Sequence, residues 1–138
     1  MFAEMCLTFD SALPSRGLRT WPPTPVSEQL SEWIHDMHTT LGTQTDMGLR
    51  LPATFAAAGL LPNPDLDCEV AISMGEEAIS RVVDLTRSFL PGMIASGTAT
   101  EEAVDIDTLS ERLRADTGSV GRVSLWPAVV GAFATKPA

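Results

Sequence analysis

The sequence predicts an α/β fold in a single domain over residues 1–138. Three observations lead to this prediction. Apolar and polar residues alternate over 66–74, which is the period of a strand with one buried face. Apolar residues recur at helical spacing over 28–41. Along the whole chain the two patterns follow the order strand, helix, helix, strand, helix, helix, strand, which is typical of an α/β protein.

The first strand is expected over residues 2–9, which are mostly apolar. Residues 10–25 hold five prolines and glycines without a sustained period and predict a loop, which Trp21 is expected to pin onto the body of the protein. Ser27 is expected to cap the helix over 28–41, and Gly42 to end it. The apolar stripe of that helix consists of Leu30, Trp33, Ile34, Met37 and Leu41.

A second helix is expected from Thr45 or Asp46 through Ala58, with Gly59 as its C′ residue. Pro52 lies inside this segment and predicts that the helix is kinked there or starts there. The alternating strand over 66–74 places Leu66, Cys68, Val70, Ile72 and Met74 on its buried face.

Helical spacing returns over 76–96, and the Pro91-Gly92 pair is expected to bend or break that helix near its end. A further helix is expected to begin at Asp105 or Asp107 and to continue to about Asp116. Residues 123–135 are apolar on both faces, which indicates a central strand. Pro127 cannot donate to a strand ladder, so it predicts a bulge or a start of pairing after that point.

The charge of the chain excludes two classes of partner. Eighteen acidic residues against nine basic ones give a net charge of −9, which repels nucleic acid and anionic membrane surfaces. Cys6 and Cys68 are too few for a disulfide framework and are expected to be buried free thiols. Glu4 stands where a signal peptide carries positive charge, and no apolar run approaches about 20 residues, so a cytoplasmic protein is expected.

Three segments carry a resemblance to a known family. They are Phe2-Ala3-Glu4-Met5, the stretch from Asp46 to Leu60 with its "MGLRL" and "FAAAGL" motifs, and the closing "VGAFATKP" of residues 130–137. In this order and at this spacing they resemble the C-terminal half of class I S-adenosylmethionine-dependent methyltransferases of the small-molecule type. The resemblance covers essentially the whole chain.

The resemblance implies a partial Rossmann-like methyltransferase sheet, made of the equivalents of strands five, seven and six. It would be a small mixed sheet with the three strands in the spatial order one, three, two, the last two antiparallel. The residues between about 76 and 118 form an insertion relative to the family. They are expected to be a helical cap over the substrate cleft or, alternatively, a bundle that thickens one face.

The family binds S-adenosylmethionine with a glycine-rich turn after its first strand and an acidic residue after its second. This chain has neither feature, since Gly17 and Gly42 are isolated and Gly59 is a helix cap. S-adenosylmethionine is therefore expected in the full-length relative, and no cofactor is expected for this chain alone.

The candidate site residues are few. His35 and His38 lie on the first helix outside its apolar stripe; they are either ordinary surface histidines or, in a complete enzyme, candidates for a catalytic general base. Glu4 falls at the carboxyl edge of the sheet, where it would face the substrate cleft or cap a neighbouring amide. No metal site is expected.

The function expected from the resemblance is that of the C-terminal portion of a methyltransferase for a small organic acceptor, inactive alone. Two alternatives stay open. One is a non-catalytic accessory subunit, which completes its sheet with another copy or with a cofactor-binding chain through the exposed edge of strand 2–9. The other is a domain that binds a small ligand.

Overall fold

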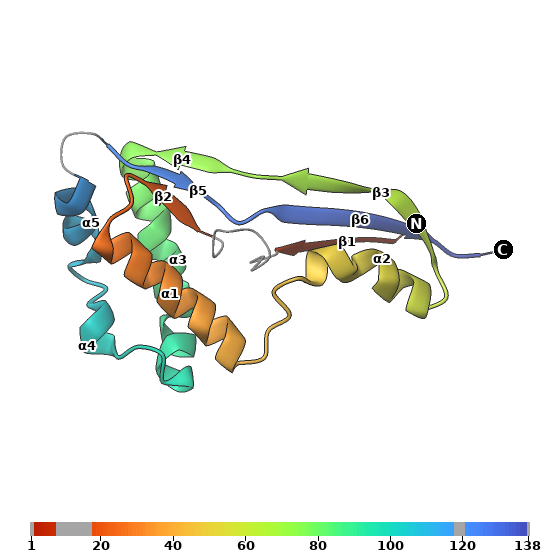
Figure 1. Ribbon diagram of the computed structural model, residues 1–138, viewed down its shortest axis with the longest axis horizontal. Helices are drawn as coiled ribbons and strands as arrows, with labels where there is room; N and C mark the ends of the chain where they lie inside the picture. The colour runs from red at the N-terminus through yellow and green to blue at the C-terminus, as the bar shows by residue number, and fades with distance from the viewer. Residues whose placement is uncertain (1, 8–17, 118–120, 138) are drawn as a thin grey trace.

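The computed structural model describes residues 2–7, 18–117 and 121–137, with side chains for the last two ranges (Figure 1). The elements in chain order are β1 (Phe2–Leu7), β2 (Arg19–Trp21), α1 (Pro25–Thr40), α2 (Met47–Ala57), β3 (Leu61–Glu69), β4 (Ile72–Met74), α3 (Gly75–Ser96), α4 (Glu101–Val104), α5 (Leu109–Thr117), β5 (Val123–Leu125) and β6 (Val129–Thr135).

The strands form two small sheets. The first, called sheet A, has the order β1-β6-β3, and the second, called sheet B, has the order β2-β5-β4. Figure 1 shows an elongated molecule in which α2 lies along sheet A at one end. The other four helices lie beside sheet B at the opposite end. Two long arms, β3 with β4 and β5 with β6, connect the two ends.

The α/β fold class is confirmed, and so is the expected strand order of one, three, two, because β6 lies between β1 and β3. The expectation of a mixed sheet is wrong. Both neighbours of β6 run antiparallel to it, with Phe2 opposite Ala134 in one ladder and Leu66 opposite Ala132 in the other. The strands β1 and β3 share a direction, but β6 separates them, so no parallel pair forms in this sheet.

The first helix begins three residues earlier than expected, at Pro25, and its cap is Thr24 rather than Ser27. The Thr24 hydroxyl accepts from the Ser27 backbone N–H at 3.3 Å, and the Ser27 hydroxyl accepts from the Thr24 backbone N–H at 3.1 Å. This reciprocal pair is a capping box with serine in its third helical position. Pro25 fits the first helical position because no N–H is needed there.

Neither internal proline marks the end of its helix. Helix α2 begins at Met47 with Asp46 as N-cap and continues past Pro52. Helix α3 continues past Pro91 to Ser96, where Gly97 ends it at a φ of 72°, so the expected break is wrong. Next to Pro91 the helix packs closely on α1: a Cβ added at Gly92 would lie 2.7 Å from Met37 Sδ.

The strand expected over 66–74 is longer, is divided, and exposes the face that was expected to be buried. It begins at Leu61 and is interrupted between Glu69 and Ile72. Its apolar residues are open to solvent: Leu66 38%, Val70 50%, Ile72 63% and Met74 68% exposed. The Cys68 thiol is also exposed, against expectation. Alternation distinguishes two faces of a strand, but the position of the helices decides which face is covered.

Two groups of apolar side chains form the core. At the helical end, α3, α4 and α5 contribute Met93, Val104, Leu109 and Leu113, each fully buried. At the other end, Leu51 and Phe55 of α2 pack on Ala132 and Ala134 of β6. The three helices fall in the stretch expected to be an insertion, and its role as a cap stays a prediction.

Trp21 does not pin a loop. It belongs to β2, which forms within the stretch expected to be loop and pairs with β5. Its side chain is 67% exposed. Side chains alternate between the two faces of a strand, and Trp21 points away from the helices. Leu18, three residues earlier, is buried in the helical core.

Neighbouring residues of α3 allow a matched test of this core. Met93 is completely buried and Ile94 is 46% exposed. We expect Met93→Ala to lower the free energy of unfolding by about 2–5 kcal/mol, because it leaves a cavity in the core. Ile94→Ala should change it by no more than about 0.5 kcal/mol. Urea denaturation followed by circular dichroism measures both, and equal losses would contradict this assignment of the core.

Candidate functional site

A hollow of about 390 Å³ lies beside α3, where β3 passes into β4 and β5 passes into β6. Its walls combine apolar side chains with one carboxylate. The lining residues are Glu69, Val70, Ala71, Leu85, Trp126, Pro127 and Val129.

The chain opens this hollow because strand pairing is interrupted at Pro127. As expected from its missing N–H, β6 begins only at Val129. Trp126 is held at the interruption by two hydrogen bonds. Its backbone N–H donates to the Ala71 carbonyl at 2.9 Å, and its indole Nε1–H donates to the Ser73 hydroxyl at 2.8 Å. The indole ring is thereby fixed as one wall.

The hollow lies at the margin of sheet A, where the two arms pass into sheet B. Val129 pairs with Leu7, at the carboxyl end of β1, and with Glu69 of β3. Because β6 runs antiparallel to both neighbours, the lining of the hollow, and not the polarity of the strands, is what indicates a binding role. The apolar wall and the single exposed carboxylate of Glu69 suit a small, largely apolar organic molecule that carries one hydrogen-bond donor.

The structure places Glu4 in β1, opposite Ala132 in the register. Its side chain lies outside the described side chains. Glu4 is near the middle of β1 and not at its carboxyl end, so that part of the expectation is wrong, and its role at a substrate cleft stays a prediction. Within the described side chains, the carboxylate at the hollow is that of Glu69.

His38 is buried rather than on the surface, which corrects the expectation from its place outside the apolar stripe. Its Nδ1 lies 2.7 Å from the Ile34 carbonyl, to which it must donate. Its ring meets that of Phe89 edge-on at 5.2 Å, so it joins α1 to α3. His35 is half-buried on the same helix. Neither histidine lines the hollow, and their catalytic roles stay predictions.

Sequence reasoning missed the residues that form the hollow, Glu69, Leu85 and Trp126. A signal was present for two of them. Glu69 is the last residue of β3, and Trp126 directly precedes the proline that interrupts the last strand. Leu85 gave no separate signal, because it belongs to the ordinary helical spacing of α3.

Arg122 is an unusual buried cation next to β5. Its side chain is 1% exposed, and its guanidinium nitrogens have no hydrogen-bond partner in the part of the chain that the structure describes. The hydroxyl of Ser124, two residues along, is also buried without a partner there. Burial lowers the pKa of Arg122, against a smaller opposite effect of Asp116. A charge buried in this way destabilises the fold.

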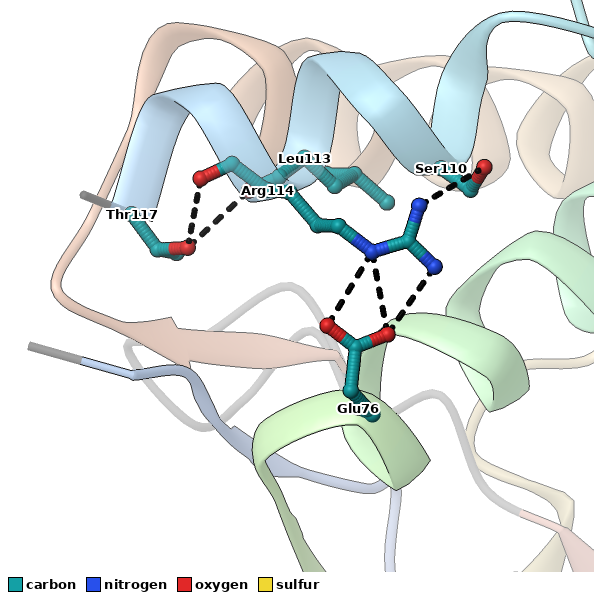
Figure 2. A network of polar contacts seen from close by, with 5 residues as sticks. All are labelled: Glu76, Ser110, Leu113, Arg114 and Thr117. Carbon is teal, nitrogen blue, oxygen red and sulfur yellow. Dashed lines mark hydrogen bonds and ion pairs between the residues drawn. The ribbon is translucent and has the colours of Figure 1, made fainter. Parts of the chain in front are cut away.

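Figure 2 shows how α5 is attached to the start of α3 by the ion pair of Glu76 and Arg114. Arg114 Nε lies 3.0 Å from both carboxylate oxygens, and Nη2 lies 2.9 Å from Oε2. The hydrogen bonds from Arg114 lower the pKa of Glu76, and the same pairing raises the pKa of Arg114. Both side chains are exposed, so the pair orients the helices rather than forming a binding site.

The described residues give no further indication of a metal or membrane function. Within the described ranges, histidine, cysteine, aspartate and glutamate side chains do not gather in groups of three that could hold a metal ion. No helix of the described part is long and apolar enough to cross a membrane.

Comparison of the chain with protein-family models, with curated proteins and with solved structures finds no match in any of the three.

The buried cation leads to a stability prediction. Arg122→Met keeps an unbranched but shorter side chain and removes its charge, and we expect it to raise the free energy of unfolding by about 1–4 kcal/mol. Thermal and urea denaturation at pH 7 measure the change. Arg81→Met is the control, because Arg81 is exposed and pairs only within α3. A loss of stability in Arg122→Met would mean that the guanidinium has a partner in solution.

The exposed ion pair leads to a pH-dependent prediction. The pKa of Glu76 is lowered from 4.5 in the folded state, so its contribution is present above about pH 5 and lost as the pH falls through the folded pKa. Glu76→Gln should therefore melt at a lower temperature than the wild type at pH 7, and the difference should shrink as the pH falls below 4.5 through the folded pKa, and also in 1 M salt. Glu77→Gln is the control, because Glu77 pairs with Arg81 inside one helix. A difference that stays constant as the pH falls well below 4.5 would contradict the assignment.

Proposed function

We propose that this chain is the substrate-side portion of an S-adenosylmethionine-dependent methyltransferase that acts on a small organic acceptor. The observation that carries the proposal is the strand order β1-β6-β3, because it agrees with the order expected from the resemblance. In this proposal sheet A is the end of a Rossmann-like sheet, and β1, β6 and β3 correspond to strands five, seven and six.

The positions of the resembling segments support the proposal. Residues 130–137 include most of the central strand β6, and residues 46–60 include α2, whose Leu51 and Phe55 pack on β6. The two segments are far apart in the sequence but form one packed unit. A resemblance by chance would have no reason to fall on residues that contact one another.

The described residues do not fit the cofactor. The single glycine that joins a strand to a helix among them is Gly75, between β4 and α3, with a φ of 57°. Glu76 and Glu77 follow it in the first turn of α3. Their negative charge opposes the binding of an anionic group at the N–H groups of this helix end. The cofactor site is therefore assigned to a separate half of the enzyme, and no reaction step is assigned to this chain through the cofactor.

The contribution of this chain would be to bind and orient the acceptor. Leu85, Trp126 and Val129 offer apolar contacts in the hollow, and the Glu69 carboxylate can accept a hydrogen bond from an acceptor hydroxyl or amine. Helix α3 lies over the hollow through Leu85, so the helices would exclude water from the acceptor. Placement of the acceptor by itself accelerates a bimolecular transfer, without a dedicated acid or base.

The proposal is tested by measuring cofactor binding and methyl transfer in two forms of the protein. Titration of the 138-residue chain with S-adenosylmethionine in a calorimeter should give no binding heat. A chain joined to a cofactor-binding segment, encoded in frame upstream or by a neighbouring gene, should transfer labelled methyl groups to small hydroxylated or amino compounds. Glu69→Gln in the joined chain should raise the KM for the acceptor, with Glu77→Gln as control. Micromolar binding of the cofactor by the 138-residue chain would contradict the proposal, and so would a joined chain that binds none.

The place of β1 favours a second candidate function, that of a non-catalytic accessory subunit. Within the described strands β1 is at the margin of sheet A, with β6 as its neighbour. The backbone groups of such an edge can pair with another chain. A separately expressed cofactor half that binds this chain without gaining methyl transfer would support the accessory role over the enzymatic one.

A further inference from the structure

Sheet B carries its polar and apolar residues on the opposite faces from those expected. The face toward the helices carries small hydroxyl residues, since Ser73 and Ser124 are buried and Thr20 is half-buried. The opposite face is called the outer face, and its residues are apolar except for one arginine. They are Arg19, Trp21, Ile72, Met74, Val123 and Leu125.

The register shows that these outer-face residues are contiguous. Trp21, Val123 and Met74 lie opposite one another across β2, β5 and β4 and form one row. The second row consists of Arg19, Leu125 and Ile72. Residues that lie opposite one another in neighbouring strands point to the same face, so the two rows form one surface.

This surface is open in the single chain. Trp21 is 67% exposed, Ile72 63% and Met74 68%, whereas Val123 and Leu125 between them are half-buried. Apolar surface on a monomeric protein is mostly scattered, and its largest contiguous patch is often an interaction site. The face toward the helices carries small hydroxyl residues instead, so sheet B places its larger apolar side chains away from its own helices.

We propose that the outer face of sheet B packs on the same face of a second copy of this chain, in a two-fold symmetric dimer. Of all the surfaces of the chain, electrostatics favours this one for contact with a second copy. Each copy has a net charge of −9, so two copies repel one another over most of their surface. The outer face contains none of the 18 acidic residues, and Arg19 is its one charged residue.

The face is complementary to itself in either alignment of two packed sheets. A two-fold axis along the strands sets Trp21 against Met74 of the second copy, an aromatic–sulfur contact, and Arg19 against Ile72. An axis across the strands sets Arg19 against Trp21 of the second copy, a cation–π contact. Neither alignment places Arg19 against itself, so no like charges meet.

The area of the outer face indicates how strong the association of two copies should be. Three large side chains exposed by about two thirds present roughly 400 Å². Two copies that bury them, together with Val123 and Leu125, reach roughly 1,000 Å² in total, which is near the lower limit of specific interfaces. Interfaces at this limit are weak or transient, so the dimer should be reversible. This inference needs neither the cofactor nor the hollow at Trp126, so it is independent of the proposed function.

The test is sedimentation velocity of the full chain at about 1–200 µM, a range that covers weak, reversible association. The wild type should shift with concentration from its mass of 14.7 kDa to twice that value. Met74→Glu adds a charge within the contact and should stay monomeric throughout. Leu49→Glu is the matched control, because Leu49 is 56% exposed on α2, away from sheet B, and it should dimerise like the wild type.

Circular dichroism spectra establish that each variant is folded, and Trp21→Ser replaces Met74→Glu if the latter does not fold. A wild type that stays monomeric at every concentration would overturn the proposal. A Met74→Glu or Trp21→Ser variant that dimerises like the wild type would also overturn it, and would direct attention to the edge of β1. Loss of the dimer in Leu49→Glu alone would place the interface on α2 instead.

Discussion

Pro127 has no backbone N–H, so the pairing of β5 cannot continue through it into β6. The last segment of the chain therefore divides into two strands that belong to different sheets, with Trp126 hydrogen-bonded to Ala71 and Ser73 at the division. The other arm is divided at the same level, between Glu69 and Ile72. Both the two-sheet architecture and the hollow beside Leu85 depend on this shared interruption.

The elements whose cause is local could be predicted from the sequence. Asp46 at the start of α2, Gly59 after its end and the delayed start of β6 after Pro127 follow from the conformational limits of single residues. The start of α1 was displaced because threonine and serine are both good caps, and only the contacts of Thr24 distinguish them. Helix α3 continues past Pro91, and there it packs on Met37 of α1 through Gly92, a tertiary contact that no local pattern contains.

The candidate site was harder to predict from the sequence, because it is formed by residues of different elements that come together only in the folded chain. Alternation over 66–74 separated Ser73 from Ile72 and Met74 correctly, but it assigned the burial to the wrong set. The hydrophobic pattern assumes that apolar residues face the chain's own core, and sheet B does not follow this rule. His38 shows the reverse case, since a residue outside the apolar stripe is buried by its contact with Phe89.

The features that depart from the usual pattern of burial and strand pairing support the same conclusion. The apolar outer face of sheet B and the marginal position of β1 each leave a physical requirement unmet within the described residues. A chain that folded only for its own stability would bury Ile72 and Met74, because burial of apolar area stabilises a fold. The distribution observed is the one expected of surfaces that pack on another polypeptide. The dimer proposed for sheet B and the cofactor half proposed for sheet A meet this requirement at different surfaces, so both partners can bind one chain at once.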